Sequence, residues 1–167
     1  TSERLRHRHA EEPADDFSRQ RLLPHQVSTD GPGLSWFDFN DDGWPDLMIS
    51  AGRGGKLAVF RNDRTGGFVP QRAALLQTPA PEGLATVLGW HPAAGETALL
   101  MGLPPSDSNR SNAVVARQFD LVTGATNEFT AASTGGAPVL ALADLDGDGS
   151  LDAFLGAGPL PGRFPEA

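Results

Sequence analysis

Oxygen-bearing side chains gather in two short windows of the chain, residues 38–46 and residues 144–152. Each window holds four Asp residues, and together they contain eight of the 21 acidic residues of the sequence. Neighbouring carboxylates repel one another by roughly 1–4 kcal/mol per close pair, depending on local screening. A fold that collects them on a tight turn therefore favours a bound cation. The alternative is a pair of solvated acidic turns, because Asp, Asn and Gly are common turn residues.

The two windows, called here the first loop and the second loop, share one spacing of oxygen donors. Both place oxygen side chains at positions 1, 3, 5 and 9 and a glycine at position 6, where positive φ lets the chain curl. Ca²⁺ takes six to eight oxygens at about 2.3–2.6 Å, whereas Mg²⁺ keeps several waters and fits this pattern less well. With position 7 contributing its backbone carbonyl, we predict two Ca²⁺ sites. The candidate ligands are Asp38, Asn40, Asp42, Trp44 and Asp46 in the first loop and Asp144, Asp146, Asp148, Ser150 and Asp152 in the second.

An EF-hand begins with the same spacing but requires a bidentate Glu at position 12 and a helix on each side. Position 12 is Ile49 in the first loop and Leu155 in the second, and neither side chain can coordinate a cation. Short apolar runs flank both loops, and such runs predict strands. They are residues 34–37, 47–49, 139–142 and 153–155. We therefore expect each loop to join two strands.

A third copy of this outline lies halfway between the two loops, which are 106 residues apart. Residues 86–90 and 97–102 are again apolar runs, and Met48, Met101 and Phe154 follow one another at intervals of 53 residues. The places of the four side-chain donors are taken by His91, Ala93, Gly95 and Leu99. We expect no metal in this middle copy.

Four strand-like runs in about 53 residues are the content of one β-propeller blade. We therefore expect an all-β fold of four-stranded antiparallel blades, forming a partial propeller of about three blades. The charged residues 1–16 are expected to be a disordered tail or linker, and residues 17–167 the propeller segment. Its parts are an outer strand of a preceding blade (17–32), a blade with a calcium loop (33–84), a degenerate blade (85–137) and a truncated blade with a calcium loop (138–167). Because propellers close with four to eight blades, the rest of the ring or self-association is needed to complete the fold.

Composition and charge limit the function classes. A chain of 167 residues with 39% hydrophobic and 20% charged residues has a globular composition. The absence of Cys excludes disulfides, zinc–thiolate sites and thiol catalysis. The net charge of −8 disfavours nucleic acid as a partner, and the lack of an 18-residue apolar run predicts no membrane insertion.

No set of Ser, His and Asp and no paired-acid site is discernible outside the two loops, so we expect a protein that is not an enzyme. The alternative is a metal-dependent hydrolase on a propeller scaffold, in which one loop holds a catalytic ion with an open coordination position. Two near-identical loops, two repeats apart, disfavour that alternative, because an active site is usually single.

The pattern Asp-x-[Asp/Asn]-x-Asp-Gly-x-x-Asp between two strands resembles the FG-GAP or VCBS repeat, a calcium-loop blade also found in integrin α-subunit heads. Residues 33–47, 57–63 and 161–166 are similar to the branch with ASPIC/UnbV domains, which includes cartilage acidic protein. The resemblance covers roughly residues 17–167 and implies that the eight side-chain donors of the two loops are the ligands. It also implies an extracellular, cell-surface or periplasmic location and a secreted module for binding or cell adhesion, with an unknown protein or glycan as ligand.

Overall fold

The computed structural model describes residues 4–10, 12–13, 15–24, 31–72, 75–80, 83–84, 86–93, 95–103, 113–121, 123–131 and 139–156. Strands dominate these residues, and the helical elements are short. The elements are helix α1 (Asp16–Arg19), 3-10 helix η1 (Leu75–Gln77) and strands β1 (Leu34–Phe37), β2 (Asp46–Ile49), β3 (Ala58–Asn62), β4 (Phe68–Pro70), β5 (Thr86–Trp90), β6 (Ala98–Gly102), β7 (Ala113–Asp120), β8 (Thr126–Ala131), β9 (Val139–Ala143) and β10 (Asp152–Gly156). None of the helices in this described part is long and apolar enough to cross a bilayer.

The strands form antiparallel sheets in which each strand pairs with the next one along the chain. The first sheet has the order β1-β2-β3-β4, the second has the order β5-β6-β7-β8, and β9 pairs with β10. The expectation of an all-β chain with four-stranded antiparallel sheets is therefore confirmed. The three sets of strands lie within residues 33–84, 85–137 and 138–167.

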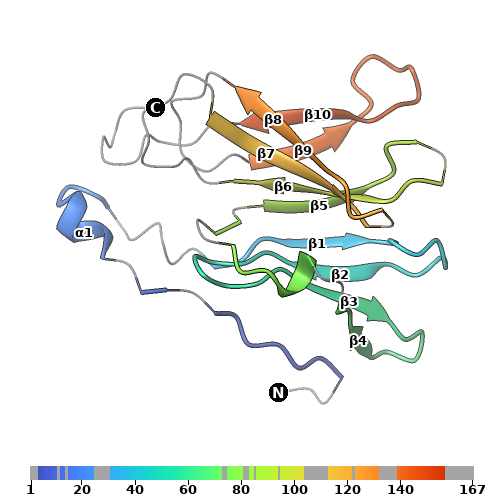
Figure 1. Cartoon of the computed structure of the whole chain (residues 1–167), viewed down its shortest axis with the longest axis horizontal. Coiled ribbons are helices and arrows are strands. Elements are labelled where there is room, and N and C mark those ends of the chain that lie inside the picture. The colour runs from blue at the N-terminus through green and yellow to red at the C-terminus, as the bar shows by residue number, and fades with distance from the viewer. Residues whose placement is uncertain are drawn as a thin grey trace.

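The sheets lie one above another, with their first strands in contact (Figure 1). Strand β1 contacts β5, and β5 contacts β9. The main core fills the space between the first two sheets, where Met48 and Leu99 are completely buried. A second cluster, built on Leu100, Ala116 and Leu140, joins the second sheet to β9. Strands β5, β6 and β7 of the second sheet thus bury apolar side chains on both faces.

Glycine permits the close approach of the first two sheets. A Cβ built on Gly89 of β5 would overlap the side chain of Phe37, the last residue of β1. The Phe37 ring also contacts the imidazole of His91 at a centroid distance of 4.7 Å. This contact fixes the ends of β1 and β5 against each other, at the edge where the turns follow.

The N-terminal segment lies along the outer face of the first sheet. Leu5 packs against the buried cluster that includes Ile49 and Phe60, and the His7 ring meets the Phe60 ring edge-on at 5.8 Å. The N–H of Phe68 donates to the carbonyl of Arg4 at 3.0 Å. The prediction that residues 1–16 form a disordered tail or linker stays a prediction, and among the described ones Leu5 and the backbone of Arg4 contact the sheet.

Helix α1 stands where the sequence predicted the outer strand of a preceding blade, residues 17–32. The Asp15 carboxylate accepts the N–H of Ser18 at 3.1 Å, which is the bond of a helix N-cap. This N-cap hydrogen bond stabilises a helical turn at Phe17, where the sequence predicted a strand. The remainder of the predicted strand, residues 25–30, lies outside the described residues.

Candidate metal centres

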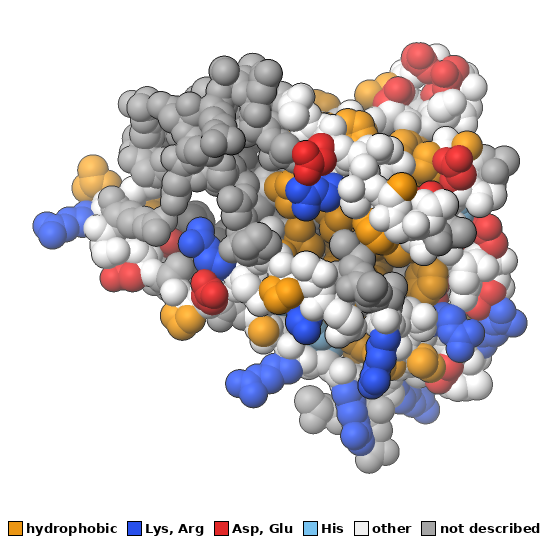
Figure 2. Space-filling view, viewed as in Figure 1, with side chains coloured by type: hydrophobic (Ala, Val, Ile, Leu, Met, Phe, Trp, Pro, Cys, Tyr) orange, Lys and Arg blue, Asp and Glu red, His pale blue; other side chains and the backbone are white. Residues whose placement is uncertain are grey.

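The two loops and the middle turn lie at the same end of the stacked sheets. In Figure 1 the turns after β1, β5 and β9 all project to the right. Figure 2 shows acidic side chains along this edge, most prominently at the upper right, where the β9–β10 turn lies. The antiparallel order explains the arrangement, since each of the three hairpins begins with a strand running in the same direction.

The first and second loops form corresponding hydrogen bonds at positions 1 and 9. At position 1, the Oδ2 atoms accept the N–H of the position-6 glycine. These bonds run from Gly43 to Asp38 at 2.6 Å and from Gly149 to Asp144 at 3.0 Å. At position 9, the Oδ2 atoms accept the N–H of position 2. These bonds run from Phe39 to Asp46 at 3.2 Å and from Leu145 to Asp152 at 2.9 Å.

Positions 3 and 5 also correspond, because each side chain accepts the N–H two residues further along. The donor and acceptor pairs are Asp42 to Asn40 (3.2 Å), Trp44 to Asp42 (3.0 Å), Asp148 to Asp146 (3.1 Å) and Ser150 to Asp148 (2.7 Å). Such bonds turn the side-chain oxygens toward the inside of the curled backbone. The shared spacing in the sequence therefore corresponds to a shared loop conformation.

Positions 4 and 6 carry the left-handed backbone conformation in both loops. The φ angles are 55° at Asp41 and 83° at Gly43 in the first loop, and 79° at Gly147 and 88° at Gly149 in the second. Sequence analysis explained only the glycine at position 6. Gly147, at position 4 of the second loop, could have predicted the left-handed conformation at that position. In the first loop Asp41 adopts the same conformation although it has a Cβ.

The second loop brings its carboxylates together. One oxygen each from Asp144, Asp146 and Asp152 lies within 4.8 Å of the others, and these side chains keep access to solvent. Among the described residues, the carboxylates of the first loop form no such group. The donors that converge are all hard oxygens, which suit Ca²⁺ better than the transition metals that prefer imidazole or thiolate.

Asp46 of the first loop is completely buried, and both of its carboxylate oxygens are bonded to the main chain. Oδ1 accepts the N–H of Asn62 at 2.7 Å, and Oδ2 accepts that of Phe39. Burial raises the pKa of Asp46, and these two hydrogen bonds partly oppose the shift. Asp46 thus ties the first loop to the end of β3, and the remaining lone pairs of its oxygens could face an ion.

Arg64, on the turn between β3 and β4, contacts the position-5 ligand of the first loop. Its Nη2 lies 2.9 Å from Asp42 Oδ2, and its Nε donates to the same oxygen at 3.3 Å. The hydrogen bond from Arg64 is the main reason why the pKa of Asp42 is lowered, although desolvation opposes it. The sequence gives no signal for Arg64, because it lies 22 positions from its partner and outside the donor pattern.

The middle turn is one residue shorter than the two loops. The strand pairs that close the three turns are Phe37 with Asp46, Ala143 with Asp152 and Trp90 with Ala98. Eight residues lie between the partners in each loop, 38–45 and 144–151, and seven lie between them in the middle turn, 91–97. Ala98 therefore takes the place of the position-9 aspartates, and the prediction that Leu99 does so is wrong by one position. Identical spacing of Met48, Met101 and Phe154 concealed the deletion.

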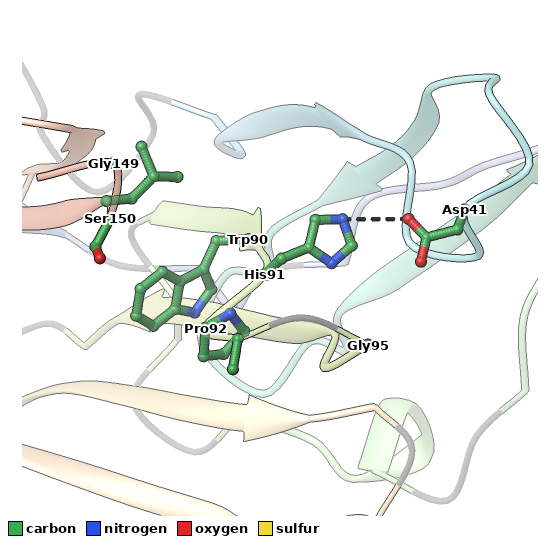
Figure 3. A pocket seen from close by; sticks show the side chains of 9 residues that line it. Asp41, Trp90, His91, Pro92, Gly95, Gly149 and Ser150 are labelled. Carbon is green, nitrogen blue, oxygen red and sulfur yellow. Dashed lines mark ion pairs between the residues drawn. The ribbon is translucent and has the colours of Figure 1, made fainter.

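The middle turn instead contributes a histidine that reaches the first loop. His91 Nε2 lies 3.5 Å from Asp41 Oδ1, and Nδ1 lies 2.9 Å from the Glu96 carbonyl, to which only a protonated nitrogen can donate. Figure 3 shows the contact between His91 and Asp41 beside a cleft of about 390 Å³. The cleft is lined by residues of all three turns, including Trp90 and Ser150. The middle turn thus stands between the two candidate centres.

No protein-family model matches the sequence, and a search of curated proteins finds no match either. What the loops can bind must therefore follow from their own geometry and donor chemistry. The two loops offer side-chain oxygens in one shared conformation, and in the second loop three carboxylates already converge. A hard divalent cation satisfies such a set, because it neutralises the carboxylates that otherwise repel one another.

Proposed function

We propose that the chain is a calcium-binding β-propeller segment with two structural Ca²⁺ sites, one in the first loop and one in the second. The observation that carries the proposal is the convergence of Asp144, Asp146 and Asp152 within 4.8 Å. The corresponding hydrogen bonds of the first loop extend the proposal to that loop. Each ion would bind the side-chain oxygens at positions 1, 3, 5 and 9 and the carbonyl of position 7, Trp44 or Ser150.

The stacking of the sheets supports the propeller part of the proposal. Sheets whose first strands contact one another in order, β1 with β5 and β5 with β9, suit blades arranged around an axis. Apolar side chains are exposed on the two outermost sheets: Trp36 is 58% exposed on the first sheet, and Phe154 is 61% exposed on the hairpin of β9 and β10. In a propeller these side chains would pack on neighbouring blades or on further copies of the chain.

The proposed role of the ions is structural rather than catalytic. Two similar sites, each joining two strands of one hairpin, suit an ion that holds a turn in place. Extracellular calcium modules bind with dissociation constants of about 10⁻⁴–10⁻³ M, so occupancy requires an extracellular, cell-surface or periplasmic compartment. The function in binding or adhesion to a protein or glycan rests on the resemblance to FG-GAP and VCBS repeats.

Thermal unfolding of the chain in EDTA and in millimolar Ca²⁺ tests the proposal. At ten times the dissociation constant each site adds about 1.4 kcal/mol to the free energy of unfolding. Two sites would then raise the Tm by about 6–11 °C in a chain of this size. Asp146→Ala should remove the part of the shift that the second loop contributes. A Tm that is the same in EDTA and in Ca²⁺ contradicts the proposal.

A further inference from the structure

The turn between β3 and β4 is attached to the first loop at three points. Asn62 donates its main-chain N–H to Asp46 Oδ1 at 2.7 Å and its side-chain Nδ2 to the carbonyl of Pro45 at 3.1 Å. Arg64 completes the attachment with its contacts to Asp42 Oδ2. The first loop is therefore held from outside by a neighbouring turn as well as by its own hydrogen bonds.

Arg64 occupies this position with an unfavourable backbone conformation. Its φ angle is 63°, a region that residues with a Cβ rarely adopt, and its N–H donates to Asn62 Oδ1 at 2.9 Å. A glycine would adopt the same conformation without strain. A strained residue whose side chain makes a specific ionic contact points to a role for that contact.

The oxygen that Arg64 contacts is the one that Asp42 has available for an ion. Asp42 Oδ1 already accepts the N–H of Trp44 at 3.0 Å, and Oδ2 receives both nitrogens of the guanidinium. The Asp42 side chain is only 11% exposed and that of Arg64 is 55% exposed, so solvent screens this contact from the Arg64 side. An ion at the first loop would have to share or displace the guanidinium, and the two positive charges repel each other.

We propose that Arg64 competes with Ca²⁺ for Asp42, so that the first loop binds the ion more weakly than the second loop and fills at a higher calcium concentration. The inference rests on the proposed calcium sites and assigns a regulating residue to one of them. Without calcium the guanidinium neutralises Asp42. When calcium binds, the guanidinium gives up Oδ2 and turns to solvent, where more than half of its side chain already lies.

The second loop provides the internal comparison. Asp148, at the equivalent of position 5, uses Oδ1 to accept the N–H of Ser150. Among the described residues no Lys or Arg forms an ion pair with Asp148. The other three carboxylates of this loop are the converging ones, Asp144, Asp146 and Asp152. Within the described part of the chain, the second loop can therefore bind the ion without displacing an Arg or Lys side chain.

Calcium titration by calorimetry, carried out on single-loop backgrounds of the full chain, tests the inference. Asp146→Ala disables the second loop, so the measured heat of binding comes from the first loop alone. On this background the Arg64→Gln variant should bind Ca²⁺ about three- to tenfold more tightly than the chain that keeps Arg64, because a repelling positive charge is removed. The effect is no larger because solvent partly screens the exposed guanidinium. Arg64→Gly removes the same charge and also the backbone strain, so it should tighten binding equally even if the glutamine variant folds poorly.

Arg53→Gln is the matched control, since it removes the same charge from the opposite end of the first sheet and should leave the first-loop affinity unchanged. First-loop binding that is unchanged or weaker in both Arg64 variants overturns the inference, and so does the absence of first-loop binding in every variant. The reverse background, Asp42→Ala, reports on the second loop. Loss of calcium binding there contradicts the proposed function itself, which separates the two failures.

Discussion

Replacement of the buried Asp46 by alanine should destabilise the fold strongly, even in the absence of calcium. The side chain is completely buried and accepts the N–H groups of Phe39 and Asn62. Each N–H group left without a partner costs about 1–3 kcal/mol, so the two together cost about 2–6 kcal/mol. Part of that loss is recovered because a buried charge, whose pKa is raised by its burial, is also removed. The expected net decrease in the free energy of unfolding is about 2–4 kcal/mol.

Asp152→Ala is the matched comparison, because Asp152 holds the same position in the second loop. Asp152 accepts one N–H, from Leu145 at 2.9 Å, and both residues keep access to solvent, which can replace the lost bond. The expected decrease is about 0.5–1.5 kcal/mol. The difference between the two variants therefore measures burial and the second hydrogen bond, rather than the loss of a carboxylate as such.

Urea unfolding followed by tryptophan fluorescence, in buffer containing EDTA, measures both variants against the unmodified chain. EDTA keeps calcium binding out of the comparison, and the three Trp residues provide the signal. Equal losses for Asp46→Ala and Asp152→Ala would refute the reasoning. A loss below about 1 kcal/mol for Asp46→Ala would show that its two main-chain hydrogen bonds contribute little.

Three further predictions use the same unfolding assay. Gly89→Ala should lower stability by about 1–3 kcal/mol, because its Cβ would overlap the Phe37 ring, and an unchanged stability would contradict the close approach of β1 and β5. Gly149→Ala should lower the free energy of unfolding by about 1–2 kcal/mol, because alanine is strained at a φ of 88° although open space surrounds the site. The same change should weaken calcium binding, and unchanged stability together with unchanged binding would contradict the loop conformation. Hydrogen bonds from Gly67 and its neighbours lower the pKa of Asp63, so the stabilisation that Asp63 adds over Asp63→Asn should be complete above the ordinary aspartate pKa and disappear as the pH falls through the lowered one. A stability gap that stays constant across that range would show that the charge of Asp63 is irrelevant.

The strands and the two loops could be predicted because they follow from local patterns. Apolar runs bounded by turn residues lie where β1, β2, β9 and β10 form, and the alternate oxygens correspond to one shared loop conformation. Gly43 and Gly149 both have the positive φ that the spacing required. Such features depend on residues within about ten positions of one another, which is the range over which a single sequence is informative.

The features that the sequence did not reveal depend on distant contacts. The ion pair of Arg64 joins two turns, and the buried Asp46 accepts a hydrogen bond from Asn62 of the next strand. The attachment of Leu5 to the first sheet depends on an apolar cluster far along the chain. The shorter middle turn, which puts Ala98 at position 9, became visible only through strand register, because a deletion in a turn leaves the apolar pattern intact.

The most direct test of the central claim is a crystal structure of the chain grown in millimolar Ca²⁺, with anomalous scattering used to locate the ion. We expect a peak in the second loop, coordinated by Asp144, Asp146, Asp148 and Asp152 and by the carbonyl of Ser150, at about 2.3–2.6 Å. A weaker peak should lie in the first loop. Density for water alone in both loops, with their carboxylates turned to solvent, would contradict the account.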